Sequence, residues 1–331
     1  MSLIEFDGAR RFFEDLPDDL KFAHLSPSYV WADSQREGDL VPTFFLYQEG
    51  GDFFCHGFHL SKVSGSDFYD IQSPYGYGGP LVRAGDKAFM ARAWESYCDW
   101  CREKRILAEF IRFHPVLENY RYYPGKIICD RSTIWVDACP EDPFDGYDSR
   151  TRSDVRRALK NGLRVKIDDT ENFLSYFKPL YIETMRRIGA AEFYNFDDSY
   201  FDAIVQTPVK LLLCLCNDVP VAGAMFLFSG ENMEYHLAAS TLDGRNLRAG
   251  HLLVHQARML ARENGCKYLH LGGGTNSDHD NKLLLFKKGF SKNMASFCIG
   301  NHVFFQEEYV RMRQRWEETM ETPNNKVLFY R

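Results

Sequence analysis

The fold is decided by residues 210–274, which read KLLLCLCNDVPVAGAMFLFSGENMEYHLAASTLDGRNLRAGHLLVHQARMLARENGCKYLHLGGG. This stretch contains, in order, three strand-like apolar runs, a loop, a helix ended by a glycine, and another strand: 210–216, 221–228, 231–239, 243–250, 251–264 and 267–271. Short turns separate the three runs, as between antiparallel strands. A helical crossover into a further strand then predicts a mixed sheet in an α/β (α+β) fold.

The first half of the chain repeats this order without sequence identity. Its three strand-like runs, a helix and a further strand fall at 43–47, 53–63, 68–72, 87–104 and 105–114. Gly50-Gly51 separates the first two runs as a hairpin turn would. We therefore expect each half of the chain to form a sheet of its own.

The length and one loop predict where the halves divide. A chain of 331 residues fits two domains of about 150 residues. Residues 139–147 hold Pro140, Pro143 and Gly146 among acidic residues, a composition typical of a linker. We expect an N-terminal domain at 1–146 and a C-terminal domain at 147–320.

Composition excludes some classes of protein. A net charge of −6 provides no overall basic field for a nucleic acid duplex. The nine cysteines show no framework spacing, which predicts reduced thiols in a cytoplasmic protein. The first fifteen residues lack the features of a signal peptide, and no apolar run is long enough to cross a membrane.

Four strings, in this order, resemble Fem-type peptidoglycan aminoacyltransferases and related tandem-GNAT acyltransferases. They are DIQSPYGYGGP at 70–80, EFIRFHP at 109–115, LGGG at 271–274 and LFKKGF at 285–290. The resemblance implies two tandem GNAT-like (acyl-CoA N-acyltransferase-like) domains with a cleft between them. It also implies that the segment 321–331, with a strand at 326–330, completes the N-terminal domain.

The resemblance implies an N-acyltransferase that moves an acyl or aminoacyl group to an amine. The acceptor would be a cell-envelope precursor of peptidoglycan or polysaccharide, lipid-linked or nucleotide-sugar-linked. Residues 245–251 depart from the Gln/Arg-x-x-Gly-x-Gly/Ala pattern of GNAT enzymes, and no helical tRNA-contacting arm is inserted. Acyl-CoA and aminoacyl-tRNA both stay open as donors, with acyl-CoA or an unidentified donor favoured, and no tightly bound cofactor is expected.

The loop 243–250 is the candidate donor site. A turn into a helix N-terminus presents backbone N–H groups to an anion, and Arg245, Arg248 and Gly250 lie there. Fem-type enzymes place a lysine of a Phe-Lys pair near the donor phosphates, and Lys287 matches it, with Lys288 beside it. The alternatives are a plain connection and a helix C-terminus stabilised by cations.

The run 231–239 matches the GNAT strand that faces the acyl group. Alternation places Glu234, His236 and Ala238 on one face of this strand. Transfer to an amine requires removal of a proton, so Glu234 or His236 is the candidate base, and we count Lys287 with them as catalytic. Either residue can equally be a polar side chain on a solvent-facing surface.

Candidate acceptor-binding residues lie in the first half. Tyr75 and Tyr77 stand in the glycine-rich loop, where they would contact a sugar or nucleobase or simply pack the loop. Arg112 and His114 share one face of their strand and suit an acidic acceptor. Glu109, on the other face, would have a raised pKa or pair with a buried arginine.

Rival interpretations remain. Five basic residues in helix 149–161 could dock RNA or phosphates, or form a solvated face. A degenerate GNAT pair that only binds a glycan or peptide is the other rival function. A metal site is not expected, because Cys98-x-x-Cys101 lacks a second pair and His251 with His255 lacks the glutamate of His-Glu-x-x-His.

Overall fold

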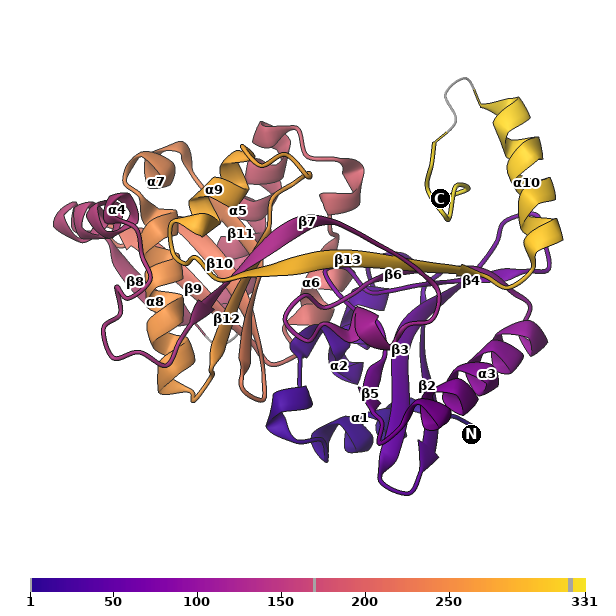
Figure 1. The fold of residues 1–331 in the computed structure, drawn as a ribbon. Helices are drawn as coiled ribbons and strands as arrows, with labels where there is room; N and C mark the ends of the chain where they lie inside the picture. The colour runs from indigo at the N-terminus through magenta and orange to yellow at the C-terminus, as the bar shows by residue number, and fades with distance from the viewer. Residues whose placement is uncertain (1, 169–170, 321–323) are drawn as a thin grey trace. The chain divides into compact units, whose positions relative to one another are not determined.

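The computed structural model describes residues 2–168, 171–320 and 324–331. The chain groups into two compact units (Figure 1). The first unit holds residues up to Leu16, His24–Asp130 and Phe297–Arg331; the second holds Pro17–Ala23 and Arg131–Ser296. The expected domain limits, 1–146 and 147–320, and the cleft between the domains stay predictions.

The first unit is a sheet covered by helices. Its elements are β1 (Ser2–Leu3), α1 (Phe6–Glu14), α2 (Pro27–Ser34), β2 (Val41–Glu49), β3 (Asp52–Lys62), β4 (Tyr69–Gln72), β5 (Leu81–Arg83), α3 (Lys87–Glu103), β6 (Ile106–Arg112), a 3-10 helix (Asn119–Tyr122), β13 (Met294–Val303, from residue 297) and α10 (Gln306–Thr319). The strand order is β1-β2-β3-β4-β6-β13, with β5 beside β3. Among the described strands of this unit, β4 and β6 pair in parallel after the crossover through α3, and the other strand pairs are antiparallel.

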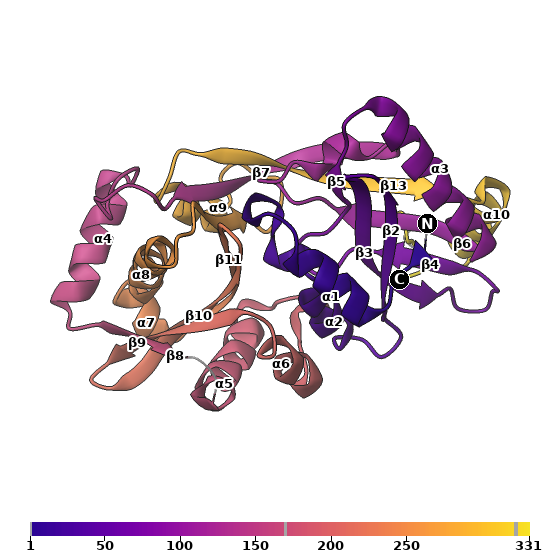
Figure 2. The same ribbon diagram turned by 90° about the horizontal axis from the view of Figure 1, so that it is seen from below.

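The second unit is a mixed sheet with helices on both faces (Figure 2). Its elements are β7 (Lys126–Asp137, from residue 131), α4 (Ser149–Lys160), β8 (Arg164–Asp168), α5 (Glu171–Ile188), a 3-10 helix (Glu192–Tyr194), α6 (Asp198–Ile204), β9 (Val209–Cys216), β10 (Val219–Ser229), β11 (Asn232–Ser240), α7 (Leu242–Asn246), α8 (Ala249–Glu263), β12 (Tyr268–Gly273), α9 (Lys282–Lys288) and the start of β13 (Met294–Val303). The strand order is β7-β12-β11-β10-β9-β8; over the residues that the structure describes, β11 and β12 pair in parallel and the other neighbours in this order are antiparallel. The mixed α/β fold expected from the sequence is confirmed.

Local interactions explain where several helices and strands begin or end. Asn217 and Asp218 both adopt positive φ between β9 and β10, as a two-residue hairpin turn requires. Gly162 and Gly265 follow α4 and α8 with φ of +76° and +74°, where a side chain would be strained. Asp148 begins α4 by accepting a hydrogen bond from the Thr151 amide at 2.6 Å.

The expected strand at 326–330 is wrong. Residues 324–331 form bends and turns, and 321–323 lie outside the described residues. Side chains hold this segment instead of backbone pairing: Phe329 packs on Tyr309 and Trp316 of α10, and Arg331 Nε donates to Asp70 Oδ2 at 2.8 Å. An aromatic anchor and an ion pair need no extended backbone, so no strand forms.

The expectation that every cysteine is reduced is also wrong. Cys129 of β7 and Cys298 of β13 form a disulfide across 169 residues of sequence, while the other seven cysteines are free. Such a cross-link stabilises chiefly by constraining the unfolded chain. Disulfides are rare in a reducing cytosol, so the cytoplasmic location stays a prediction. Among the described helices, none is long and apolar enough to cross a membrane.

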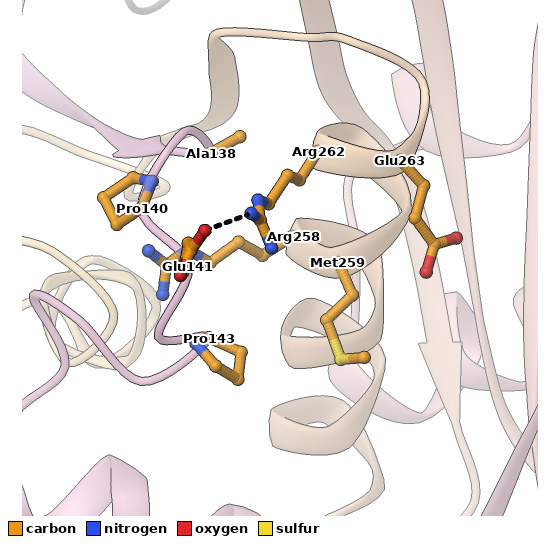
Figure 3. Close-up of a pocket in the computed structure, with 8 residues that line it drawn as sticks. All are labelled: Ala138, Pro140, Glu141, Pro143, Arg258, Met259, Arg262 and Glu263. Atoms are coloured by element: carbon orange, nitrogen blue, oxygen red, sulfur yellow. Dashed lines mark ion pairs between the residues drawn. The ribbon is translucent and has the colours of Figure 1, made fainter.

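The linker at 139–147 packs along α8 (Figure 3). Arg258 of α8, only 2% exposed, donates to the backbone carbonyls of Asp137 and Asp145 at 3.1 and 3.2 Å. Its guanidinium also lies 5.6 Å from the centre of the Tyr147 ring. The linker is therefore a fixed part of the second unit.

Glu109 is buried in the first unit beneath α3. Its carboxylate accepts hydrogen bonds from the hydroxyls of Tyr97 and Tyr123, at 2.7 and 2.6 Å. Burial raises the pKa of Glu109 to about 7, although the two tyrosine hydroxyls oppose the shift. Of the two alternatives that the sequence left open, the structure supports the raised pKa, and the partners of Glu109 are tyrosines instead of a buried arginine.

Replacing Glu109 by Gln is expected to remove a pH dependence of stability. The folded protein holds a proton between about pH 4.5 and 7 that the unfolded chain releases. The free energy of unfolding therefore falls by about 1.4 kcal/mol per pH unit in this window, relative to the variant. Urea unfolding of both proteins at pH 5, 6 and 7 measures this difference. Parallel stability profiles would contradict the assignment.

Candidate functional site

The two parallel strands of the second unit separate along their length. Strands β11 and β12 pair only over 232–234 and 268–270, so Glu234 and His270 form the last pair. Beyond this point β11 continues to Ser240 and β12 to Gly273 without pairing to each other. The separation exposes backbone groups of two strands to a shared space, which a ligand or a side chain can fill.

A β-bulge lies just past the point of separation. Tyr235 pairs with Phe226 and Leu237 with Met225, so His236 is the extra residue of β11. A bulge reverses the alternation of side chains. Met233, Tyr235 and Ala238 consequently pack against one core, and the expectation that Ala238 shares a face with Glu234 is wrong.

Lys287 of α9 fills the space between the separated strands. Its Nζ donates to the Gly273 carbonyl of β12 at 2.8 Å and lies 5.6 Å from the centre of the Tyr235 ring of β11. The residue is 6% exposed, and this burial lowers its pKa to about 7. At neutral pH both the charged and the neutral amine are therefore populated.

The glycines at 272–274 permit this arrangement. Gly272 has a φ of +73° at a second bulge, where the register of β12 against β7 shifts. A Cβ on Gly274 would stand 2.6 Å from Oδ1 of Asn281, the residue that caps α9. These glycines therefore mark a β-bulge and a close approach of the cap of α9.

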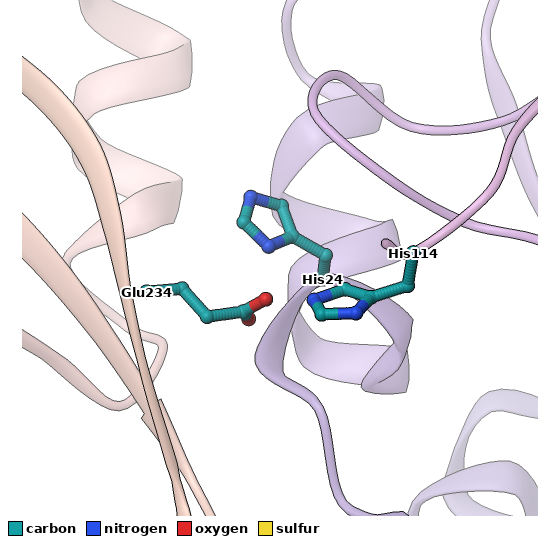
Figure 4. A group of neighbouring side chains, drawn as sticks. All are labelled: His24, His114 and Glu234. Carbon is teal, nitrogen blue, oxygen red and sulfur yellow. The ribbon is translucent and has the colours of Figure 1, made fainter. Parts of the chain in front are cut away.

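Glu234 and His236 differ in their surroundings. Glu234 is 1% exposed, so its interpretation as a solvent-facing residue is wrong; Figure 4 draws its side chain on β11. Nε2 of His236 lies 2.6 Å from the Tyr200 hydroxyl of α6, within hydrogen-bonding distance. Tyr200, which no sequence motif indicated, thereby orients the imidazole.

A pocket of about 430 Å³ lies where α4, α8 and α9 meet. Its lining includes Arg248, Arg150 from the basic helix that the sequence offered for phosphates or RNA, and three residues that it did not assign to a ligand: Asp154, His251 and Lys282. Arg248 Nε is 3.1 Å from Asp154 Oδ1, and His251 Nε2 is 3.5 Å from Asp154 Oδ2. Burial lowers the pKa of His251, which disfavours its charged form.

The structure brings one of the four predicted phosphate-binding residues to this pocket. Arg248, with a φ of +69°, begins α8 and lines it. Arg245, Gly250 and Lys288 are not among the lining residues. The expected loop 243–250 is partly helical, because the Thr241 hydroxyl caps α7 by accepting from the Gly244 amide.

The predicted acceptor residues lie in the first unit. The centre of the Tyr77 ring is 5.1 Å from that of the buried His114 ring and 5.2 Å from that of the His24 ring. Figure 4 draws both imidazoles. No sequence motif indicated His24. The Tyr75 carbonyl accepts a hydrogen bond from the Tyr29 hydroxyl at 2.8 Å, and the Tyr75 amide donates one to Asp33 Oδ2 at 2.8 Å. The Arg112 guanidinium lies 4.9 Å from the Phe110 ring centre.

Comparisons with known proteins agree with this architecture. The profile of the acetyltransferase (GNAT) domain family matches residues 149–281, less than half of the chain. The crystal structure of FemX is similar over 94% of this chain and 100% of that one, with a TM-score of 0.72 and 17% identity. No curated protein sequence matched.

Two further structures share the fold at lower similarity. The C-terminal domain of a putative lysylphosphatidylglycerol synthetase from Agrobacterium fabrum has a TM-score of 0.58 and 15% identity, over 85% of this chain and 90% of that one. L-PGS from Bacillus licheniformis has a TM-score of 0.54 and 13% identity, over 82% and 90%. The resemblance to Fem-type and tandem-GNAT proteins is thus confirmed as a likeness of fold.

Replacing Lys287 by Met is expected to flatten the stability profile above neutral pH. Between about pH 7 and 10.5 the unfolded lysine keeps a proton that the folded one has lost. The free energy of unfolding of the parent protein therefore rises by about 1.4 kcal/mol per pH unit there, relative to the variant. Urea unfolding at pH 7, 8 and 9 tests this, and an equal slope in both proteins would refute burial of the amine.

Proposed function

We propose that the protein is an N-acyltransferase that moves an acyl or aminoacyl group from an activated ester or thioester to an amine. The observation that carries the proposal is the buried Lys287 amine between the separated ends of β11 and β12. A fixed cation beside unpaired strand backbone suits the negative oxygen that develops when an amine attacks a carbonyl. The similarity of fold to FemX and to the GNAT profile supports the same reaction class.

In the proposed mechanism Lys287 stabilises the oxyanion. One N–H of its ammonium group is used by the Gly273 carbonyl, and the other two can reach the acyl oxygen. Because its pKa is about 7, the charged form declines as the pH rises above neutrality. The tetrahedral intermediate then collapses, the ester or thioester bond breaks, and the leaving group takes a proton.

Glu234 is the proposed base. It lies at the last paired position of β11, directly before the strands separate, and is turned to the opposite face from Tyr235. An amine approaching from the Glu234 face would lose its proton to this carboxylate while the acyl oxygen meets Lys287. His236, bonded to Tyr200, is proposed as a positioning residue at the bulge.

The pocket at the start of α8 is the proposed donor site. Arg150, Arg248 and Lys282 line it and suit the phosphates of acyl-CoA or of the acceptor end of aminoacyl-tRNA. Asp154 pairs with Arg248 and holds its guanidinium in place. We favour acyl-CoA, since no arm for tRNA is inserted, and expect no tightly bound cofactor.

The proposed acceptor is an amine on a cell-envelope precursor. The Fem-type likeness supports a peptidoglycan or polysaccharide precursor, and the name of the Agrobacterium fabrum neighbour points to transfer onto a lipid headgroup in that protein. The aromatic surface of Tyr77, His114 and His24 would contact a sugar of the acceptor.

The transfer reaction tests this function through Lys287. Release of free CoA thiol from acetyl-CoA, and release of labelled amino acid from aminoacyl-tRNA, are measured with an amine-bearing muropeptide precursor. Lys287→Met is expected to lower kcat by about 100-fold or more with little change in KM. The parent rate should fall above about pH 7, and Lys287→Arg should lose that fall because arginine stays charged. Unchanged kcat in Lys287→Met would remove Lys287 from the mechanism, whereas no turnover with either donor would favour the glycan- or peptide-binding interpretation.

Calorimetric titration of the Arg248→Gln variant and the parent protein with CoA tests the donor site. Loss of one phosphate contact is expected to weaken CoA binding by about tenfold or more. Arg164→Gln is the matched control, because Arg164 also pairs with an aspartate, Asp218, at 2.8 Å but is exposed on β8. Equal effects of the two variants would place the phosphates elsewhere.

A further inference from the structure

A second pocket, of about 460 Å³, lies between the linker and the C-terminal half of α8. It shares no lining residue with the donor pocket. We propose that it binds a small organic monocarboxylate, with the carboxylate on Arg258 and Arg262 and an apolar body against Pro140, Pro143 and Met259 (Figure 3). The proposal concerns binding alone and stands independently of the transfer reaction.

The buried guanidinium of Arg258 is the main support for this proposal. It is 2% exposed, and within the described ranges its hydrogen bonds go to two carbonyl oxygens, with no carboxylate paired to it. A guanidinium offers five N–H donors, so the two carbonyls leave donors unused, and only these carbonyls and the Tyr147 ring offset its positive charge. Burying a charge without an ionic partner is costly, and an anion entering the pocket would reduce that cost.

Arg262 provides the second cation. It follows Arg258 by four residues, one helical turn along the same face of α8. Its guanidinium lies 3.8 Å from the carboxylate of Glu141, whose side chain is 94% exposed (Figure 3). Such an exposed ion pair contributes little and is screened by salt, so a ligand carboxylate can replace Glu141.

The remaining lining decides the class of anion. Ala138, Pro140, Pro143 and Met259 form apolar walls, which favour a hydrocarbon body. Glu141 and Glu263 also line the pocket, so the two arginines face two carboxylates. A phosphate dianion would be repelled more strongly than a single carboxylate. A monocarboxylate with an apolar body therefore fits both the charge and the walls.

Calorimetry of the full chain with sodium benzoate, and with neutral benzamide as its isostere, tests the site. We expect saturable benzoate binding, and benzamide binding weaker by about tenfold or more, since only the carboxylate forms charge-assisted hydrogen bonds. Glu141→Gln should tighten benzoate binding by about two- to fivefold, because it removes the competing carboxylate. Glu183→Gln is the matched control, as Glu183 pairs with Arg187 at 3.9 Å on α5, and should change nothing.

Two variants test whether benzoate binds in this pocket. Arg258→Met should abolish benzoate binding. Met259→Trp should also abolish it by filling the pocket while leaving both arginines in place, which keeps the test valid if Arg258→Met fails to fold. Benzoate binding that persists in Met259→Trp, equal binding of benzamide, or no effect of Glu141→Gln would each overturn the proposal.

Discussion

The burial of the Lys287 amine between β11 and β12 is the constraint on which the second unit depends. An ammonium ion removed from water must be compensated, and here a carbonyl of one strand and the ring face of the other do so. That compensation is available only because the strands separate after Glu234 and His270. The same burial gives the amine a pKa near neutrality, where a lysine can change its charge during a reaction.

Local backbone irregularities produce this geometry. The bulge at His236 turns Ala238 to the face of Tyr235, and a second bulge at Gly272 shifts the register of β12 against β7. Gly274 then lets Asn281 approach and cap α9, which sets the position of Lys287. Each device is a departure from regular structure, and the three occur together beside the candidate site, as expected where strain serves a function.

Buried ionisable groups outside this site are compensated in different ways. Glu109 is held by two tyrosine hydroxyls and keeps a proton more readily than usual, whereas Arg258 retains its charge on backbone carbonyls. A protonated carboxyl leaves no charge in the interior, so Glu109 is satisfied within the first unit. A guanidinium cannot lose its proton, and its charge remains beside an open pocket.

The sequence by itself determined the element order, the turns at Asn217-Asp218 and Gly265, the likeness to tandem-GNAT folds, and the choice of Lys287 and Glu234 as candidates. These follow from hydrophobic periodicity, turn-forming residues and short sequence motifs, each of which is read over a few residues. Only the tertiary structure decided the pairing of Cys129 with Cys298, the ion pair of Arg248 with Asp154, the contact of Tyr77 with His24, and the anchoring of 324–331 without a strand. Each of these joins segments far apart in the chain. Local patterns carry no information about which distant side chains meet, because the packing of the whole unit chooses the partners.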